Sequence, residues 1–174
     1  RWYEVTGVQT CALPIWMCTA DGEPMDETKH TYNHAFAIYA LAAYARASGR
    51  EKALKQAVGL FELIESRMVR DGYYLDAFNR AFKPLQNTKL SDSPKLLARG
   101  VVAEKTMNTL LHVLEAYTLL YEVSGDPRVK ERLVGLLRLI RGTVYNPEKN
   151  RPDVIFNLAM KPLIDMQSYG HDIE

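Results

Sequence analysis

Four histidines are the residues of this chain best suited to acid/base chemistry: His30, His34, His112 and His171. An imidazole takes up or releases a proton near neutral pH, so histidine can serve as general acid, general base or hydrogen-bonding ligand. A lone histidine in an apolar helix is more often a hydrogen-bonded structural residue than a functional one. The neighbours of His112 and His171 set these two apart from the others.

Asn108, His112 and Glu115 form a polar stripe in the otherwise apolar segment 105–117, KTMNTLLHVLEAY. Steps of four and three residues place their side chains on one face of a helix. Polar groups in an apolar helix need hydrogen-bond partners. The pattern leaves two interpretations open: a buried Asn–His–Glu hydrogen-bond network, or the lining of a polar pocket.

The last seven residues, SYGHDIE at 168–174, place His171 and Glu174 three residues apart. If a helix begins at Gly170, these two side chains share one face. One interpretation is a helix start whose acidic residues lie near the positive end of the helix dipole. The other is a His–x–x–Glu metal-binding pair. A single pair supports a metal site only weakly, and we expect none.

These residues must be positioned by helices, because apolar residues recur at helical spacing through most of the chain. The helical pattern covers 28–49, 51–72, 103–125 and 126–142. Gly49 and Gly125 are typical of the position just after a helix, and Asp126 followed by Pro127 suits a helix start. The sequence therefore predicts an all-α protein.

Two segments do not follow the helical pattern. Residues 72–85, GYYLDAFNRAFKPL, are aromatic and irregular and predict a loop or a short hairpin. Residues 154–163, VIFNLAMKPL, predict a short β element.

The two expected helix pairs are related by an internal repeat. Gly49 and Gly125 are 76 residues apart, and at the same offset Val58-Gly59-Leu60 matches Val134-Gly135-Leu136. Repeated helical hairpins indicate either an α-solenoid or a closed ring of α/α hairpins. Long connections favour the ring, because such scaffolds build sites from loops on one face.

Composition excludes several classes of protein. The 174 residues are 47% hydrophobic and 25% charged, with a net charge of +1, which gives no footprint for nucleic acid or an anionic membrane. No apolar run has the roughly 20 residues of a membrane span. With Cys11 and Cys18 alone, no disulfide framework is indicated, and a reduced, cytoplasmic protein is the default expectation. Oligomeric state cannot be predicted.

The N-terminal segment differs from the rest. It lacks the basic start and long apolar core of a secretion signal. Residues 5–15, VTGVQTCALPI, match one reading frame of a common sequencing-library adapter. We interpret residues 1–16 as a non-native, adapter-like segment to be excluded from fold reasoning. We expect the domain to occupy residues 17–174 and to be an internal fragment of a longer protein, truncated at both ends.

Three ordered motifs resemble the N-acylglucosamine 2-epimerase superfamily, and within it the cellobiose 2-epimerase branch. They are KHTYNHAFAIYALAAY at 29–44, KTMNTLLHVLEAYTLLY at 105–121 and SYGHDIE at 168–174. The resemblance covers essentially all of residues 17–174. It implies a partial (α/α)6 barrel, present here as an open arc of helical hairpins. It also implies an isomerase that interconverts glucose and mannose configuration at the reducing end of cellobiose-type disaccharides, with neither a redox cofactor nor an obligatory metal.

The resemblance also assigns roles. His171 would be one of two acid/base histidines that move the C2 proton through an enediolate. His112 and Asn108 would bind sugar oxygens, Glu174 would bond a hydroxyl or orient its neighbour, and Tyr32 is a weaker candidate for substrate contact. The second acid/base histidine and the stacking aromatics of the family would follow residue 174, and a family arginine would precede the domain. We therefore expect this chain to be inactive alone.

Two departures concern fine specificity. Leu110 stands where many relatives have histidine, and His34 where glutamine is common. An N-acylglucosamine 2-epimerase or a mannose isomerase remains an alternative, because the resemblance implies that these enzymes share the barrel and the histidines. From other classes, a helical-repeat binding scaffold would bury or separate His112 and His171, and a glycoside hydrolase would need two suitably spaced carboxylates.

Overall fold

The computed structural model describes residues 14–86, 97, 98, 100 and 103–163. Within these residues, the α-helices are α1 (Thr31–Ser48), α2 (Glu51–Arg67), α4 (Met107–Ser124) and α5 (Pro127–Leu139), and a π-helical turn, η2 (Ile140–Val144), follows α5. The strands are short: β1 (Met17–Cys18), β2 (Pro24–Asp26), β3 (Lys29–His30), β4 (Val69–Arg70), β5 (Tyr73–Tyr74), β6 (Ala77–Phe78), β7 (Pro84–Leu85), β8 (Lys105–Thr106), β9 (Tyr145–Asn146), β10 (Arg151–Pro152) and β11 (Ile155–Phe156).

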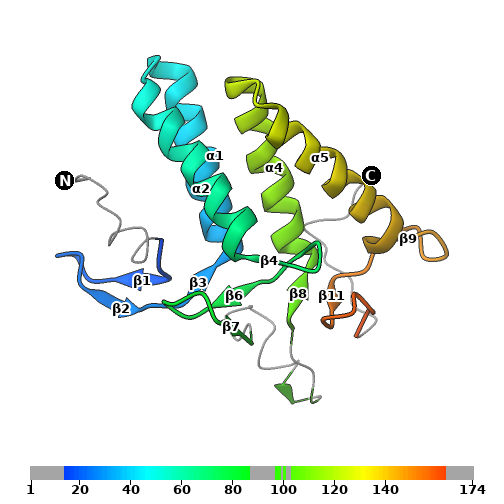
Figure 1. Ribbon diagram of the computed structural model, residues 1–174. Helices are drawn as coiled ribbons and strands as arrows, with labels where there is room; N and C mark the ends of the chain where they lie inside the picture. Colours follow the sequence, from blue (N-terminus) through cyan, green and yellow to red (C-terminus); the bar gives the residue numbers. More distant parts are fainter. Residues whose placement is uncertain (1–13, 87–96, 99, 101–102, 164–174) are drawn as a thin grey trace.

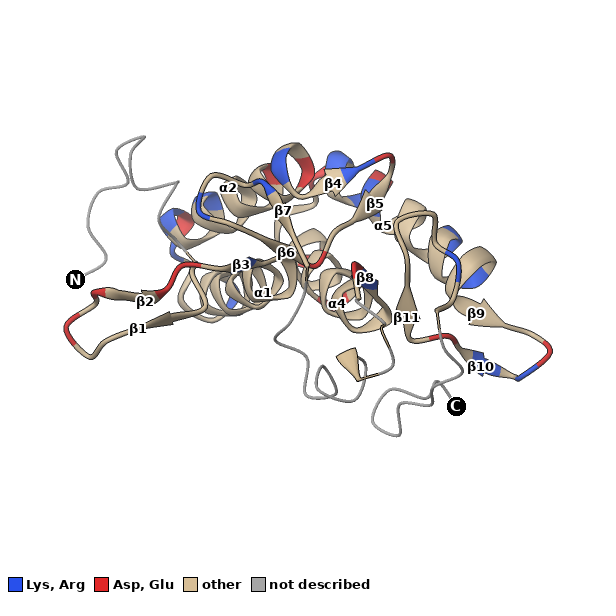
Figure 2. Cartoon of the chain, turned by 90° about the horizontal axis from the view of Figure 1, so that it is seen from below, with Lys and Arg blue, Asp and Glu red and all other residues tan. Residues whose placement is uncertain are grey.

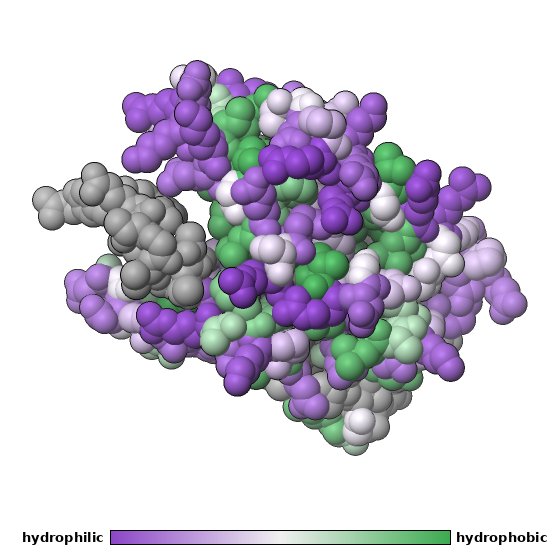
Figure 3. All heavy atoms as spheres, in the orientation of Figure 1, coloured by the Kyte–Doolittle hydropathy of each residue, from purple (hydrophilic) through white to green (hydrophobic). Residues whose placement is uncertain are grey.

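The helices form two antiparallel hairpins in two layers. Helices α1 and α4 lie side by side, α2 packs on α1, and α5 packs on α4 (Figures 1 and 2). Charge distribution explains the layers: α1 carries Arg46 as its one charged residue and α4 carries Glu115 and Glu122, whereas α2 is rich in charges of both signs and α5 is rich in basic residues. Hydrophilic side chains accordingly cover much of the surface over α2 in Figure 3. The described part of the chain is an open arc of helical hairpins, as predicted.

Small residues allow α1 to approach its neighbours closely. Its buried face repeats Ala35, Ile38, Ala42 and Ala45 at three- and four-residue steps. The core then fills with larger side chains from α2 and α4, among them Phe61, Ile64, Val113, Tyr117 and Leu120. Close packing of this kind fixes the rotation of α1 against α4, and that rotation decides which residues remain on the open face.

Local signals set three helix ends where the sequence predicted them. Gly49 and Gly125 both have left-handed backbones, with φ of 68° and 64°, and each donates its N–H to the carbonyl four residues earlier. The Asp126 side chain caps α5 by accepting from the N–H of Arg128, with Pro127 in the first turn. These predicted boundaries are confirmed.

Three predicted boundaries are wrong, because strand pairing interrupts the helical pattern. Helix α1 begins at Thr31 rather than at Thr28, since Lys29–His30 pairs with Ala77–Phe78. Helix α2 ends at Arg67 rather than near Gly72, since Val69–Arg70 pairs with Tyr73–Tyr74. Helix α4 begins at Met107 rather than at Ala103, since Lys105–Thr106 pairs with Ile155–Phe156. The expected β element at 154–163 is thus present, and its partner is the segment just before α4.

The internal repeat extends into the strands. Strand β6 pairs with β3 before α1, and β11 pairs with β8 before α4. After β6 and β11, AFNRAFKPL (77–85) and IFNLAMKPL (155–163) form matching turns. In each, the asparagine side chain, Asn79 or Asn157, accepts from the backbone N–H two and four residues later. This second repeat was not identified from the sequence.

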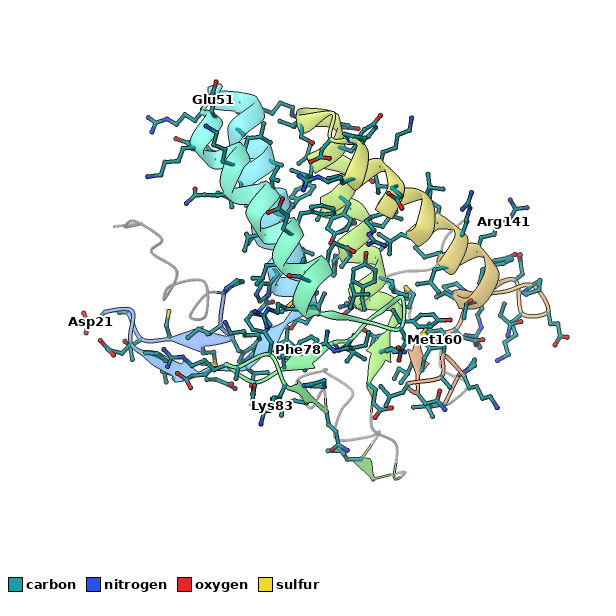
Figure 4. All side chains as sticks on the ribbon, viewed as in Figure 1. Asp21, Glu51, Phe78, Lys83, Arg141 and Met160 are labelled. Atoms are coloured by element: carbon teal, nitrogen blue, oxygen red, sulfur yellow. The ribbon has the colours of Figure 1, made fainter. Side chains whose placement is uncertain are left out.

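All these strands gather at one end of the helices. Figure 4 places Phe78 and Met160 at this strand end and Glu51, where α2 begins, at the opposite end. Helices α1 and α4 both begin at the strand end, and Asp76 joins their starts. Its carbonyl accepts from the N–H of Thr31, and its carboxylate accepts from the N–H and hydroxyl of Thr106, both at 3.1 Å. The first turns of the two inner helices are therefore tied together.

Four side chains form a polar network inside the helical layers. The hydroxyls of Tyr74 and Tyr117 donate to Glu65 Oε1 at 2.7 and 2.8 Å. Arg132 of α5 pairs with Glu65 Oε2 at 2.9 Å. Burial raises the pKa of Tyr117 well above its usual value, and Tyr74 follows the same direction, so both hydroxyls remain donors. Glu65 thus links α2 to α4, α5 and the β4–β5 hairpin.

Among the described residues, none of the helices has the length and apolar character needed to cross a membrane.

Candidate functional site

Three of the five predicted site residues lie in the described part of the chain. Tyr32 is in the first turn of α1, Asn108 is in the first turn of α4, and His112 is one turn further along α4. His171 and Glu174 lie outside the described residues. The structure brings Tyr32 and His112 together, with ring centroids 6.4 Å apart.

His112 is held between a carboxylate and an aromatic ring. Its Nδ1 lies 2.8 Å from Glu115 Oε2, and the Phe36 ring centroid lies 4.4 Å from the imidazole. The side chain is 17% exposed, whereas that of Glu115 is 51% exposed. Because a carboxylate only accepts, Nδ1 carries the proton in this contact. His112 is therefore oriented at the surface of the α1–α4 pair and is not sealed in the core.

The two interpretations of the polar stripe can now be compared. Within the described residues, the His112–Glu115 hydrogen bond is formed, but no hydrogen bond joins Asn108 to His112. Asn108 is half-buried and Glu115 is exposed. A fully buried network is therefore not what the stripe forms. Its geometry fits a polar wall along an open face.

An aromatic wall lies beside this polar one. Tyr32 and Phe36 are edge-to-face with centroids 6.2 Å apart, and Phe36 and Tyr39 are each about half exposed. Trp16, the last residue of the segment interpreted as non-native, lies 4.9 Å from His30 and 6.2 Å from Tyr32 between ring centroids, and we do not count it as part of the wall. The rings present apolar faces next to the polar groups of α4.

The aromatic wall could have been found from the internal repeat. At the 76-residue offset, Tyr32, Phe36 and Tyr39 correspond to Asn108, His112 and Glu115. Helices α1 and α4 are both 18 residues long and adjacent, so equivalent positions face the same open side. Sequence reasoning identified the polar set and Tyr32, but missed Phe36 and Tyr39.

Tyr32 remains a hydroxyl donor at neutral pH. Partial burial, with a smaller contribution from the charge of Asp76, raises its pKa to about 12. A phenol in this state can donate to a carbonyl or hydroxyl oxygen of a ligand and cannot act as a base.

A groove runs from Glu115 along the α1–α4 pair, away from the polar and aromatic walls. Its volume is about 370 Å³. Arg46 and Glu122, 3.6 Å apart, form an ion pair at the end remote from the strands. The residues that line the groove are Tyr39, Arg46, Leu114, Glu115, Thr118, Leu119 and Glu122.

His34 does not belong to this site. It is fully buried, donates from Nδ1 to the His30 carbonyl at 2.8 Å, and lies with its ring 6.4 Å from Phe82. Burial, together with the charge of nearby Lys29, lowers its pKa to about 4 despite the backbone hydrogen bond. Leu110, the other departure from the family pattern, is also buried. Both positions contribute to the core of the described structure.

The buried His34 predicts a loss of stability in mild acid. In the unfolded chain a histidine takes up a proton near pH 6.5, but the folded protein resists protonation until about pH 4. The unfolded state therefore binds the extra proton first, and stability falls between these two pH values by up to about 3 kcal/mol. Urea denaturation from pH 7.5 to pH 4 checks this against His34→Gln, which cannot titrate. Parallel curves for the two proteins would show that His34 does not cause the loss.

Comparisons with known proteins decide the family. The sequence model of the N-acylglucosamine 2-epimerase (GlcNAc 2-epimerase) family matches residues 14–174. The chain belongs to this family. The match begins three residues before Met17. The start of the native domain at Met17 stays a prediction.

Curated relatives of this chain include cellobiose 2-epimerases. That of Eubacterium cellulosolvens is 43% identical over 180 residues, which cover 94% of this chain and 43% of the relative. That of Ruminococcus albus is 44% identical over 172 residues, covering 99% of this chain and 41% of the relative. The chain thus spans about two-fifths of the length of these members of the N-acylglucosamine 2-epimerase family. The resemblance found in the sequence motifs is confirmed.

Solved structures agree. The sugar epimerase from a ruminal bacterium superposes with a TM-score of 0.83 at 43% identity, over 90% of this chain and 39% of that one. Cellobiose 2-epimerase from Bacillus thermoamylovorans gives 0.81 at 38% identity, with the same coverage. D-mannose isomerase, at 20% identity and a TM-score of 0.65, shares the fold. The predicted class, all-α with a partial α/α barrel, is confirmed.

Proposed function

We propose that this chain supplies part of the active site of a sugar 2-epimerase. The reaction would interconvert glucose and mannose configuration at C2 of the reducing-end residue of a cellobiose-type disaccharide. The observation that carries the proposal is the pairing of walls on the open face: Asn108 and His112 of α4 beside Tyr32 and Phe36 of α1. The cellobiose 2-epimerase relatives, at 43–44% identity, support this substrate class.

A bound sugar would use both the polar wall of α4 and the aromatic wall of α1. Its ring edges carry hydroxyls that require hydrogen-bond partners, and its C–H faces pack against aromatic rings. Asn108 offers both donor and acceptor groups, and His112 offers a ring nitrogen. Phe36 and Tyr32 offer apolar faces within 6.4 Å of that imidazole.

The proposed chemistry moves one proton and is redox-neutral. In the open-chain sugar the C2 proton is acidified by the adjacent aldehyde, and a base with a pKa near neutrality removes it. The planar enediolate is then reprotonated on its other face. We assign His171 to one of the two proton-transfer roles, and His112 and Asn108 to hydrogen bonds with the oxygen-bearing groups of the sugar. Tyr32, as a protonated phenol, would donate to a sugar oxygen, and Glu174 would bond a hydroxyl.

The proposal is tested with the full-length enzyme in D₂O. We expect cellobiose to give a product with mannose at the reducing end, carrying deuterium at C2 because a protein acid exchanges its proton with solvent. Conversion of free mannose to fructose would favour a mannose isomerase, and turnover of N-acetylglucosamine alone would favour an N-acylglucosamine 2-epimerase. The absence of turnover with all three sugars would overturn the proposal.

A helical-repeat binding scaffold is the alternative from another class. It predicts that His112 and His171 are buried or far apart, and the partial exposure of the His112 side chain argues against burial of that residue. The same D₂O experiment separates the two, because a scaffold exchanges no C2 proton.

A further inference from the structure

Glu115 contacts His112 without a structural need for doing so. The two residues lie three apart on α4, with Oε2 2.8 Å from Nδ1. The Glu115 side chain is 51% exposed. A polar pair at such an exposed position contributes little to the stability of the fold. Arg46, which lines the same groove, is paired with Glu122 instead.

The internal repeat provides an independent comparison. In the first helical hairpin, the positions equivalent to His112 and Glu115 are Phe36 and Tyr39. That hairpin folds and packs with no polar pair at these positions. The His112–Glu115 pair is therefore an addition to the repeat and not one of its requirements.

The contact determines which ring nitrogen carries the proton. In a neutral imidazole one nitrogen donates and the other accepts. Because the Glu115 carboxylate can only accept, it holds the proton on Nδ1, and Nε2 becomes the acceptor. The Phe36 ring, 4.4 Å from the imidazole, restricts rotation of the side chain at the same time.

We infer that Glu115 is a positioning residue, which fixes the tautomer and orientation of His112 so that Nε2 accepts a hydrogen bond from a sugar hydroxyl. This inference rests on the proposed function and adds the direction of one hydrogen bond to it: the sugar hydroxyl donates and His112 accepts. An imidazole with its proton on Nε2 would instead present a donor to the same oxygen. Such a reversal costs affinity whenever the hydroxyl must find another acceptor.

The discriminating variant is Glu115→Gln in the full-length enzyme. Glutamine keeps the size and the acceptor oxygen but adds an amide N–H₂ that can donate to an unprotonated Nδ1. We expect NMR of histidine-labelled enzyme at alkaline pH to show a single Nδ1–H tautomer for His112 in the wild type and a mixture in the variant. We expect kcat/KM to fall roughly tenfold, mainly through KM, as when a group that orients a histidine is lost.

Glu122→Gln is the matched control. It makes the same chemical change one heptad further along α4, where the carboxylate faces Arg46 rather than a histidine. This control should change neither tautomer nor KM, and both variants should melt within about 1 °C of the wild type. An unchanged His112 tautomer in Glu115→Gln, or an equal loss in Glu122→Gln, would overturn the inference. The tautomer measurement does not depend on turnover, so it remains decisive even if the proposed reaction is not observed.

Discussion

Glu65→Ala is expected to destabilise this chain by about 3 kcal/mol, because it removes the shared acceptor of two buried hydroxyls and the partner of an arginine. The Tyr74 and Tyr117 hydroxyls, now 2.7 and 2.8 Å from Glu65 Oε1, would lose that partner. For a chain of this length the loss corresponds to a fall in melting temperature of roughly 10 °C. Thermal and urea denaturation followed by circular dichroism measure it.

Glu62 provides the control for this prediction. It lies one turn before Glu65 on α2 and also pairs with an arginine, Arg128, at 2.7 Å, but both side chains are more than half exposed. Glu62→Ala should therefore cost less than about 1 kcal/mol. Equal losses for the two variants would show that burial of the Glu65 network is not what stabilises the contact between layers.

His112→Phe should abolish most activity of the full-length enzyme while leaving its stability nearly unchanged. Phenylalanine is already the residue at the equivalent position of α1, where it is Phe36. The new ring in α4 can therefore keep the packing that His112 now makes against Phe36. Both ring nitrogens are lost, together with the hydrogen bond that Nε2 would accept from a sugar hydroxyl. Leaving that hydroxyl without its partner lowers kcat/KM by about 10- to 100-fold. Steady-state kinetics on cellobiose and a parallel melting curve measure the two effects.

His34→Gln is the companion variant for His112→Phe. It also removes an imidazole, but from the buried face of α1, where the ring contacts Phe82. At pH 7.5, where the His34 ring is neutral, we expect activity within about threefold of the wild type. If His112→Phe retained activity at the level of His34→Gln, His112 would have no role in sugar binding.

Features determined by neighbouring residues could be predicted from the sequence. The ends of helices at Gly49, Gly125 and Asp126 depend on local backbone conformation and capping, and they lie where expected. The placement of Asn108 and His112 on one face follows from helical geometry alone. The family was likewise evident from three ordered motifs.

Features that depend on partners far away in the sequence could not be predicted from the sequence. Helix α4 begins at Met107 because Lys105–Thr106 pairs with a strand about 50 residues later, and helical periodicity carries no information about that pairing. The shift of α2 to an earlier end has the same cause at shorter range. Propensity at a helix end is weak enough for such tertiary contacts to override it.

The candidate site shows most clearly which features follow from local sequence and which depend on tertiary contacts. The sequence by itself determined that Asn108, His112 and Glu115 would share one helix face, because a helix brings every third and fourth residue into line. Only the tertiary structure decided that Phe36 closes over His112, since this needs α1 and α4, 76 positions apart, to pack at one particular rotation. That rotation is set by the small buried face of α1 and by the Asp76 bridge between the helix starts. Neither contact is encoded within a single helix, which is why the aromatic half of the site came from the fold.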